Sequence, residues 1–295
     1  MKQFLLFLTF IFLPIAMQNS ASAEKKEIVM GFNPAENAEV VEARSKVFLN
    51  WVEKKSGLKI KTFVSMDYTA LVEALRSGRV DFAWLPPFSY VKAEQIAHAT
   101  VLLKVIRHGK ATYYSAIITR ADKPYNKVED LKGKNIAWVD PSSTTGHIIP
   151  KASLIIKKGI DPDTFFHKQI FAGAHDAVVL SVINGTVDAG ATYLNDAEGK
   201  DGSWNLYLKS PEDRKKIKIL FISDPIPSDT LATSQKFLKE NPETVKLTVK
   251  TLIDMTKDPE GKKIIQDLYH VDGLEKATSK DFDPVRNAAK VLKID

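Results

Sequence analysis

Short apolar runs alternate with amphipathic segments along the first third of the chain. Residues 27–32 (EIVMGF), 58–64 (LKIKTFV) and 80–85 (VDFAWL) have the apolar, β-rich composition of strands. Between them, residues 38–55 carry one apolar stripe at helical spacing, and the segment after Asp67 predicts a second helix with Asp67 as its N-cap. This order of strands and helices predicts a parallel sheet covered by helices.

A second unit with the same alternation follows. Two long strands are predicted over 100–109 and 112–120. The further predicted elements are strands over 135–140, 165–171, 187–194, 216–223 and 224–234, and helices over 146–158, 177–184 and most of the chain after Pro242. Two successive α/β patterns predict an α/β protein with two related lobes.

The N-terminal segment has the features of a secretory signal peptide. A lysine at position 2 precedes an apolar run over 4–16, and Ala21-Ser22-Ala23 forms a small-x-small cleavage pattern. The apolar run is too short for a stable membrane span. Residues 1–23 are therefore predicted to be removed, which leaves an exported, soluble chain in the periplasm.

Composition bears on several classes of protein. The chain has no cysteine, so its stability must come from buried apolar area. The net charge of +6 is modest for 295 residues and the lysines are scattered, which does not support nucleic-acid binding. Six histidines without paired spacing argue against a metal site, and no cofactor motif is present.

Several stretches resemble one family of transport proteins. They are EIVMGFNPAENAE, SMDYTALVEALRSGRVDFAWLPPFSYV, YYSAIITRADKPYNKVEDLKGKNIAWVDPSSTTGHIIP and AGAHDAVVLSVINGTVDAGATY. Together they resemble the phosphate-, phosphite- and phosphonate-binding proteins of ABC importers. The resemblance implies a type II periplasmic binding fold, in which each of two lobes holds a mixed, mainly parallel sheet flanked by helices. We expect the protein to be a monomer. The resemblance places lobe one at 24–119 plus 225–295 and lobe two at 120–224, with a hinge of two crossing segments and the ligand between the lobes.

The stretch Ser142 to Gly146 is a candidate anion site. It stands at the start of a predicted helix, where unpaired backbone N–H groups and the positive end of the helix dipole attract anions. Ser143, Thr144 and Thr145 would add neutral hydroxyl donors, and Gly146 would allow close backbone approach. Plain capping needs only one hydroxyl, and Ser142 can serve as that cap.

The resemblance adds one histidine and a wall of tyrosines. It implies that His175 lies at the ligand, where its ring N–H would donate to a phosphoryl oxygen and a protonated ring would add charge. His147, in the first turn of a helix, has the weaker case. The resemblance also implies ligand contacts from Tyr68 and from one of Tyr113 and Tyr114, since neighbours on a strand face opposite sides. Tyr113 is the preferred choice.

Two acidic positions bear on the chemistry of the ligand. Aminoalkylphosphonate binders of the family hold the ligand ammonium with two carboxylates. One of these falls at Asp229 and the other at Asn195, with Asp196 beside it. If Asn195 occupies the second position, the ammonium clamp is incomplete and the ligand lacks an amine. A shift of one residue would restore the clamp through Asp196.

The predicted function is capture of a phosphorus oxyanion (phosphonate, phosphite or phosphate) for delivery to the permease of an ABC importer. One alternative keeps the fold and reports the anion to a membrane sensor kinase. Another places a sulfonate or a different oxyanion in the same site. A third is a secreted serine hydrolase using Ser143 or Ser142 with His175 and Asp229, although the chain has no Gly-x-Ser-x-Gly elbow.

Overall fold

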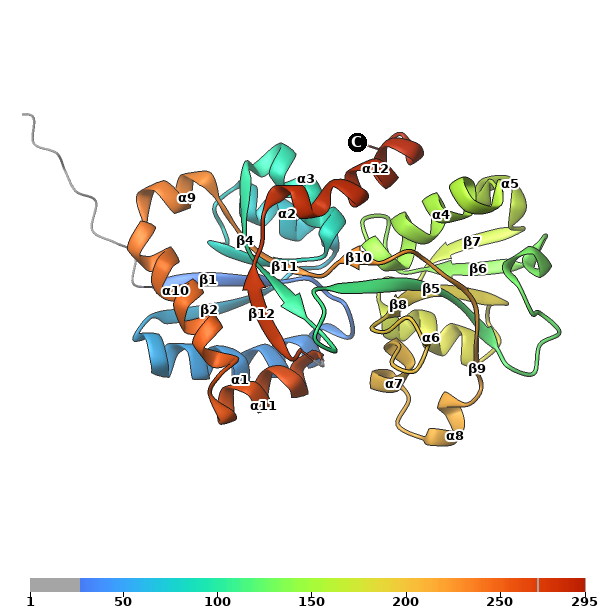
Figure 1. Cartoon of the computed structure of the whole chain (residues 1–295), viewed down its shortest axis with the longest axis horizontal. Coiled ribbons are helices and arrows are strands. Elements are labelled where there is room, and N and C mark those ends of the chain that lie inside the picture. Colours follow the sequence, from blue (N-terminus) through green and yellow to red (C-terminus); the bar gives the residue numbers. More distant parts are fainter. Residues whose placement is uncertain (1–26, 270, 295) are drawn as a thin grey trace, which may run out of the picture.

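Two sheets lie side by side, each with helices on both faces (Figure 1). The computed structural model describes residues 27–269 and 271–294, so the predicted signal peptide lies outside the described residues. We call the sheet that contains residue 27, with its helices, the first lobe, and the other sheet with its helices the second lobe. None of the helices in the described ranges is both long and apolar enough to cross a bilayer.

The first sheet has the strand order β12-β4-β11-β3-β1-β2. Its strands are β1 (Glu27–Phe32), β2 (Lys59–Val64), β3 (Phe82–Leu85), β4 (Ala99–Ile106), β11 (Thr230–Ser234) and β12 (Gly273–Lys276). β1 is parallel to β2 and β3, whereas β11 is antiparallel to β3 and β4, and β12 is antiparallel to β4. The predicted strand over 27–32 is confirmed at both ends.

The second sheet has the order β10-β5-β8-β6-β7, with β9 paired to β5. Its strands are β5 (Thr112–Arg120), β6 (Asn135–Trp138), β7 (Lys168–Phe171), β8 (Ala189–Leu194), β9 (Ile217–Ile222) and β10 (Ile226–Pro227). β6 is parallel to β7 and β8, and β5 is antiparallel to β8, β9 and β10. In both sheets the antiparallel pairs outnumber the parallel ones, so the sheets are mixed rather than mainly parallel.

Helices cover both faces of each sheet. The first lobe has α1 (Ala38–Ser56), α2 (Tyr68–Arg76), α3 (Pro87–Ala97), α9 (Gln235–Glu240), α10 (Pro242–Met255), α11 (Pro259–Tyr269), a 3₁₀ turn (Ser279–Phe282) and α12 (Asp283–Leu292). The second has a 3₁₀ turn (Val128–Leu131), a π turn (Thr144–Ile148), α4 (Ile149–Lys158), α5 (Pro162–Phe165), α6 (His175–Ile183), α7 (Ser203–Tyr207) and α8 (Pro211–Arg214). Asp67 caps α2 as predicted, because its Oδ1 accepts the Ala70 N–H at 2.7 Å.

The chain crosses between the sheets in two short segments. β4 ends in the first sheet and β5 begins in the second after residues 107–111, and residues 228–229 lead from β10 back to β11. The predicted first lobe extended to 119, but residues 112–120 pair with the second sheet. The predicted return at 225 likewise precedes β10, which still pairs with β5. Local patterning detects a strand but not the sheet to which it belongs.

The C-terminal segment contacts both lobes. β12 adds a strand to the first sheet within a region predicted to be almost entirely helical. α12 then packs against α3 and also against α4 of the second lobe. Phe282, Val285 and Ala289 share one buried apolar cluster with Ile148 and Ile149.

A loop after β1 joins the lobes on another side. The Ala35 carbonyl accepts the His175 N–H at 3.0 Å, and the Asn37 N–H donates to the Asp176 carboxylate at 3.2 Å. Glu36 between them is only 5% exposed and pairs with Arg44 at 2.7 Å. Burial, reinforced by the negative charge of Asp176, raises the pKa of Glu36 from 4.5 to about 7 despite Arg44.

Replacing Glu36 with glutamine should therefore change how stability depends on pH. When folding raises the pKa of a carboxyl group, the protonated group stabilises the folded protein at every pH below the pKa of the unfolded chain. For Glu36 this stabilisation is lost as the pH rises from 4.5 through 7. The unfolding free energy of Glu36→Gln, relative to wild type, should rise by roughly 3 kcal/mol from pH 4 to pH 8. Urea unfolding at several pH values measures this difference. The variant Glu39→Gln, at an exposed position in the first turn of α1, is the control, and equal slopes for the two variants would contradict the assignment.

Candidate ligand-binding site

A cavity lies between the lobes and takes residues from both. Its lining includes six of the predicted site residues, namely Tyr68, Tyr113, Ser143, Thr145, His175 and Asp229. The space open to the centres of water-sized groups is about 110 Å³, whereas one water needs roughly 10–15 Å³ by this measure. The cavity can thus hold a ligand of several non-hydrogen atoms.

The start of a helix forms one wall. A π turn over 144–148 continues without a break into α4, and Ser143 is its N-cap, with Oγ accepting the Gly146 N–H at 3.1 Å. The first N–H groups of a helix have no partner within it and stand at the positive end of its dipole. Ser143 and Thr145 line the cavity beside these groups, which is the arrangement predicted for an anion site.

Thr144 has a different task. Its Oγ1 accepts the Phe88 N–H at 2.8 Å, and α3, which begins at Pro87, has no side-chain cap of its own. The second lobe therefore supplies the N-cap of a first-lobe helix. Ser142 also contacts the other lobe, through a 3.2 Å hydrogen bond between its Oγ and Thr69 Oγ1. Neither Thr144 nor Ser142 is among the described residues that line the cavity.

Gly146 is required by packing within the second lobe. A Cβ at this position would stand 2.3 Å from Val139 Cγ2 and 2.5 Å from Val139 Cβ. The glycine therefore lets the π turn lie against the end of β6, with the Val139 N–H donating to the Gly146 carbonyl at 3.1 Å. The structure places Gly146 in this contact rather than in the cavity lining.

Two tyrosines reach the cavity, Tyr68 from the start of α2 and Tyr113 from the start of β5. Tyr68 is 1% exposed, and its hydroxyl lies near Ser143 and Asn33 without hydrogen-bond geometry to any described residue. Burial raises the pKa of Tyr68, so the hydroxyl keeps its proton and is a donor at neutral pH. Tyr113 lines the same cavity, and burial raises its pKa too. Tyr114, on the opposite side of β5, packs in the second-lobe core.

His175 opens α6 and lies at the cavity as a neutral ring. It is 5% exposed, and this burial lowers its pKa to about 3. Its Nδ1 lies 2.9 Å from Thr192 Oγ1, which donates onward to Ser203 Oγ. The Thr192 hydroxyl donates its hydrogen to Ser203, so it can only accept a hydrogen bond from His175. The hydrogen of the neutral imidazole is therefore on Nδ1. At neutral pH His175 therefore adds no positive charge, unlike the protonated ring considered from the sequence.

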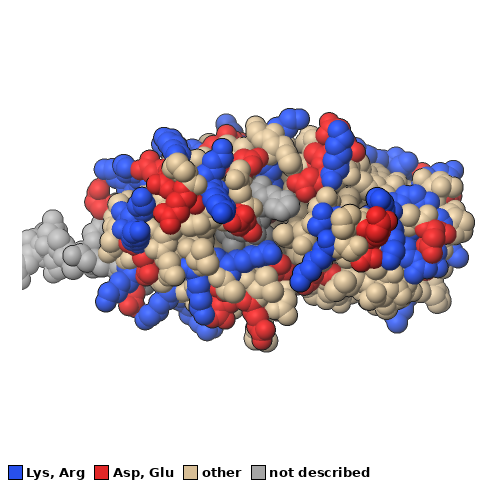
Figure 2. All heavy atoms as spheres, turned by 90° about the horizontal axis from the view of Figure 1, so that it is seen from below, with Lys and Arg blue, Asp and Glu red and all other residues tan. Residues whose placement is uncertain are grey.

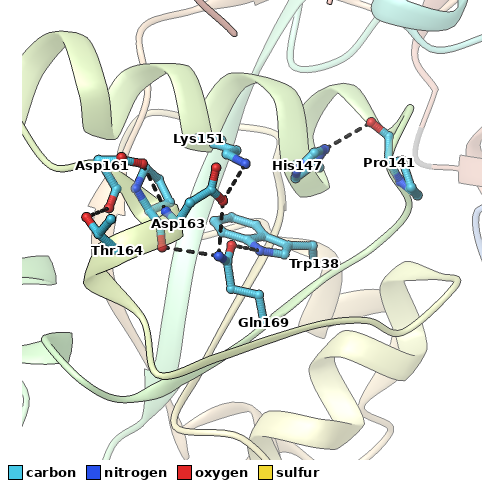
Figure 3. A network of polar contacts seen from close by, with 9 residues as sticks. Trp138, Pro141, His147, Lys151, Asp161, Asp163, Thr164 and Gln169 are labelled. Carbon is cyan, nitrogen blue, oxygen red and sulfur yellow. Dashed lines mark hydrogen bonds and ion pairs between the residues drawn. The ribbon is translucent and has the colours of Figure 1, made fainter.

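His147 is not among the described residues that line the cavity. Its Nδ1 lies 2.9 Å from the Pro141 carbonyl, and its ring packs edge-on against Trp138, 5.6 Å between centroids (Figure 3). Phe171 lies on another side at 5.0 Å. Burial lowers the pKa of His147 to about 4. The surroundings of His147 are those of a packed ring, as the weaker case from the sequence allowed.

Asp229 lines the cavity as half of an ion pair. Its Oδ2 lies 3.1 Å from a guanidinium nitrogen of Arg107, which also lines the cavity. Arg107 is 7% exposed and lies in the first crossing, and Asp229 lies in the second. The pair therefore ties together the two segments that connect the lobes, and its charges offset each other.

The second acidic position does not reach the cavity. The Asn195 side-chain amide donates to the Asp201 carboxylate at 3.1 Å, and Asp201 lies 2.8 Å from His108 Nε2. The Asp196 carboxylate accepts the backbone N–H groups of Lys200 and Asp201 and so closes a loop. Neither Asn195 nor Asp196 is among the described lining residues.

Sequence reasoning missed four polar residues of the lining. They are Asn33, Arg107, Tyr193 and Tyr207. Asn33 directly follows β1, and residues at the carboxyl ends of parallel strands often meet a ligand, so that position carried a readable signal. Arg107 continues the alternation of buried positions along β4 and was also detectable. Tyr193 lies edge-on to His175 at 5.0 Å, a contact that only the folded chain reveals.

The close approach of Gly146 to Val139 can be tested by substitution. Gly146→Ala should lower the unfolding free energy by about 1–3 kcal/mol, since the added methyl overlaps a buried side chain. Gly273→Ala is the control, because its Cβ would meet Ile106 at an ordinary 3.6 Å. Thermal unfolding of both variants measures the difference, and equal melting temperatures would refute the steric role of Gly146.

Known proteins are similar to this chain in sequence and in architecture. A family model described as "ABC transporter, phosphonate, periplasmic substrate-binding protein" matches residues 30–282. The phosphate-import protein PhnD of Mycolicibacterium smegmatis is 35% identical over 183 residues, which cover 59% of this chain and 57% of that protein. The phosphonates-binding periplasmic protein of Escherichia coli is 28% identical, over 84% of this chain and 72% of its own length.

A solved structure agrees in fold. The structure of PhnD1 from Prochlorococcus marinus in complex with methylphosphonate superposes with a TM-score of 0.79, at 21% identity over 92% of this chain and 99% of that one. This likeness confirms the two-lobed fold that the resemblance implied. Since the family model covers most of the sequence, the chain belongs to the periplasmic substrate-binding proteins of phosphonate ABC transporters.

Proposed function

We propose that the protein captures a phosphorus oxyanion between its lobes and delivers it to the permease of an ABC importer from the periplasm. The observation that carries the proposal is the Tyr68 hydroxyl, a buried donor without a hydrogen-bond partner among the described residues. Leaving such a group unpaired costs about 1–3 kcal/mol. A ligand oxygen in the cavity would accept this hydrogen bond and remove the cost.

The balance of donors and charges favours an oxyanion. The hydroxyls of Ser143 and Thr145 are neutral donors at the start of a second-lobe helix, and Tyr68 adds a third neutral donor from the first lobe. Arg107 gives a buried positive charge, which Asp229 partly offsets. Together these groups suit a tetrahedral anion that needs several hydrogen bonds and little compensating charge.

The acids indicate what the ligand lacks. Asp229 is the one carboxylate among the described lining residues, and Arg107 already engages it. Asn195 and Asp196 bond within their own loop. A ligand ammonium would therefore find no carboxylate clamp of the kind predicted for aminoalkylphosphonate binders. This supports a ligand without an amine.

The relatives support phosphorus in particular. The E. coli protein is named for phosphonates, the M. smegmatis protein for phosphate import, and the P. marinus structure holds methylphosphonate. On the face shown in Figure 2, acidic and basic side chains are interspersed over both lobes without one continuous basic area. That surface is consistent with a small-molecule carrier rather than a nucleic-acid binder.

A hydrolase is disfavoured by the hydrogen bonds already formed. Ser143 Oγ caps the π turn, His175 Nδ1 faces Thr192, and Asp229 pairs with Arg107. A serine–histidine–carboxylate relay needs the carboxylate on the histidine and the histidine on the serine. Among the described residues these bonds are replaced by others, so we propose binding without turnover.

Ligand-dependent stabilisation tests the proposal. Methylphosphonate at about 100 times its dissociation constant should stabilise the protein by roughly 2.7 kcal/mol, whereas sulfate should have a smaller effect. Differential scanning fluorimetry and calorimetry on the chain from residue 24 measure both. If phosphite, phosphate and methylphosphonate all leave the melting temperature unchanged, the assignment to phosphorus fails.

Tyr68→Phe separates a binding role from a folding role. Its hydroxyl has no partner among the described residues, so its loss should leave the unliganded protein as stable or more stable. The affinity for methylphosphonate should fall by about 10-fold, the equivalent of one hydrogen bond to a charged group of about 1.5 kcal/mol. Tyr90→Phe is the opposite control. The Tyr90 hydroxyl donates to Glu94 at 2.8 Å outside the cavity, so this variant should lose stability and keep its affinity.

A further inference from the structure

The cavity has an apolar half that the anion does not need. Beyond the polar groups, its apolar lining includes Phe48 from α1, Val105 from β4, Ile265 from α11, and Val271 and Leu274 around β12. All five belong to the core of the first lobe, and each is at most 8% exposed. An oxyanion gains nothing from such a wall.

The apolar half begins directly beside the polar half. Val105 and Arg107 are two positions apart and both buried, so they follow one another along the same side of the chain. The Val105 N–H donates to the Asp229 carbonyl at 3.0 Å, which fixes this boundary between the apolar half and the ion pair. A substituent on an anion held by the hydroxyls of Ser143, Thr145 and Tyr68 would therefore contact the apolar wall of the same cavity.

Aromatic rings stiffen the apolar half. Phe48 packs edge-on to Phe32 at 6.4 Å and to Trp84 at 6.1 Å, and all three rings line the cavity. The Trp84 Nε1–H lies 3.3 Å from Met30 Sδ and is thus held by the sheet. Interlocked rings resist collapse into the space, which preserves a preformed apolar site.

We propose that this half of the cavity, the apolar subsite, binds a hydrocarbon substituent on the phosphorus atom of the ligand. The preferred ligands are alkyl- or arylphosphonates larger than methylphosphonate. The inference rests on the proposed function, because the anion must first be held at Ser143, Thr145 and Tyr68. It goes beyond that function by naming the substituent as apolar and uncharged.

A chain-length series on the wild-type protein tests the subsite. Calorimetry with methyl-, ethyl-, propyl- and butylphosphonate should show the dissociation constant falling about fourfold per methylene until the subsite is full. Propylphosphonate should bind more tightly than 2-aminoethylphosphonate, which has the same number of non-hydrogen atoms but ends in an ammonium. If methylphosphonate binds and longer chains bind equally or less well, the subsite is refuted and the proposed function stands. If no phosphonate binds, the subsite is refuted, and the proposed function fails with it only if phosphite and phosphate do not bind either.

A substitution that fills the apolar subsite tests whether the alkyl substituent binds there. Val271→Phe should abolish the gain of propyl- over methylphosphonate, because the larger side chain fills the subsite. Methylphosphonate binding in the same sample shows that the variant is folded. If that variant does not fold, Val271→Ala enlarges the subsite instead and should shift the tightest binder to a longer chain. An unchanged chain-length profile in a folded variant would contradict the placement of the substituent.

Discussion

The hydrogen bond from the Phe88 N–H to Thr144 Oγ1 is the contact on which the geometry of the cavity depends. It caps a first-lobe helix that has no side-chain cap of its own, and it anchors the π turn of the second lobe to that helix. With Thr144 committed to the other lobe, Ser143 and Thr145 on either side remain to line the cavity. Four hydroxyl residues in a row thus divide between holding the lobes together and offering donors to a ligand.

Local chemistry made much of the fold predictable. β1 and β5 have the predicted limits, and Asp67 caps α2, because apolar alternation and side-chain caps act over a few residues. Partnership between strands is not local. β5 joins the second sheet through β8 and β9, and β12 is a strand because it pairs with β4, although residues 273–276 have little apolar character. The π turn was also missed, since it follows from the contact of Gly146 with Val139.

The candidate site was predictable to the extent that residue type and family resemblance fixed a position. Six of the predicted residues share the cavity lining, but Thr144, Gly146 and His147 immediately beside them do not. Sequence spacing cannot tell which neighbour in a turn faces inward. It also gave no sign that Asp229 would meet Arg107, because the two lie 122 positions apart and are joined only when both crossings are in place. That pairing changed the expected chemistry of the acid from ammonium acceptor to charge partner.

The C-terminal helix has a consequence for how the molecule would exchange its ligand. α12 belongs to the first lobe yet packs on α4, so the two lobes share buried apolar surface outside the cavity. A protein that is already mostly closed loses little intrinsic affinity to the work of closing. The same contact opposes separation of the lobes, because separation exposes that surface to water. Opening of the lobes would then require α12 to separate from α4, so the C-terminal helix bears on ligand exchange although none of its residues lines the cavity.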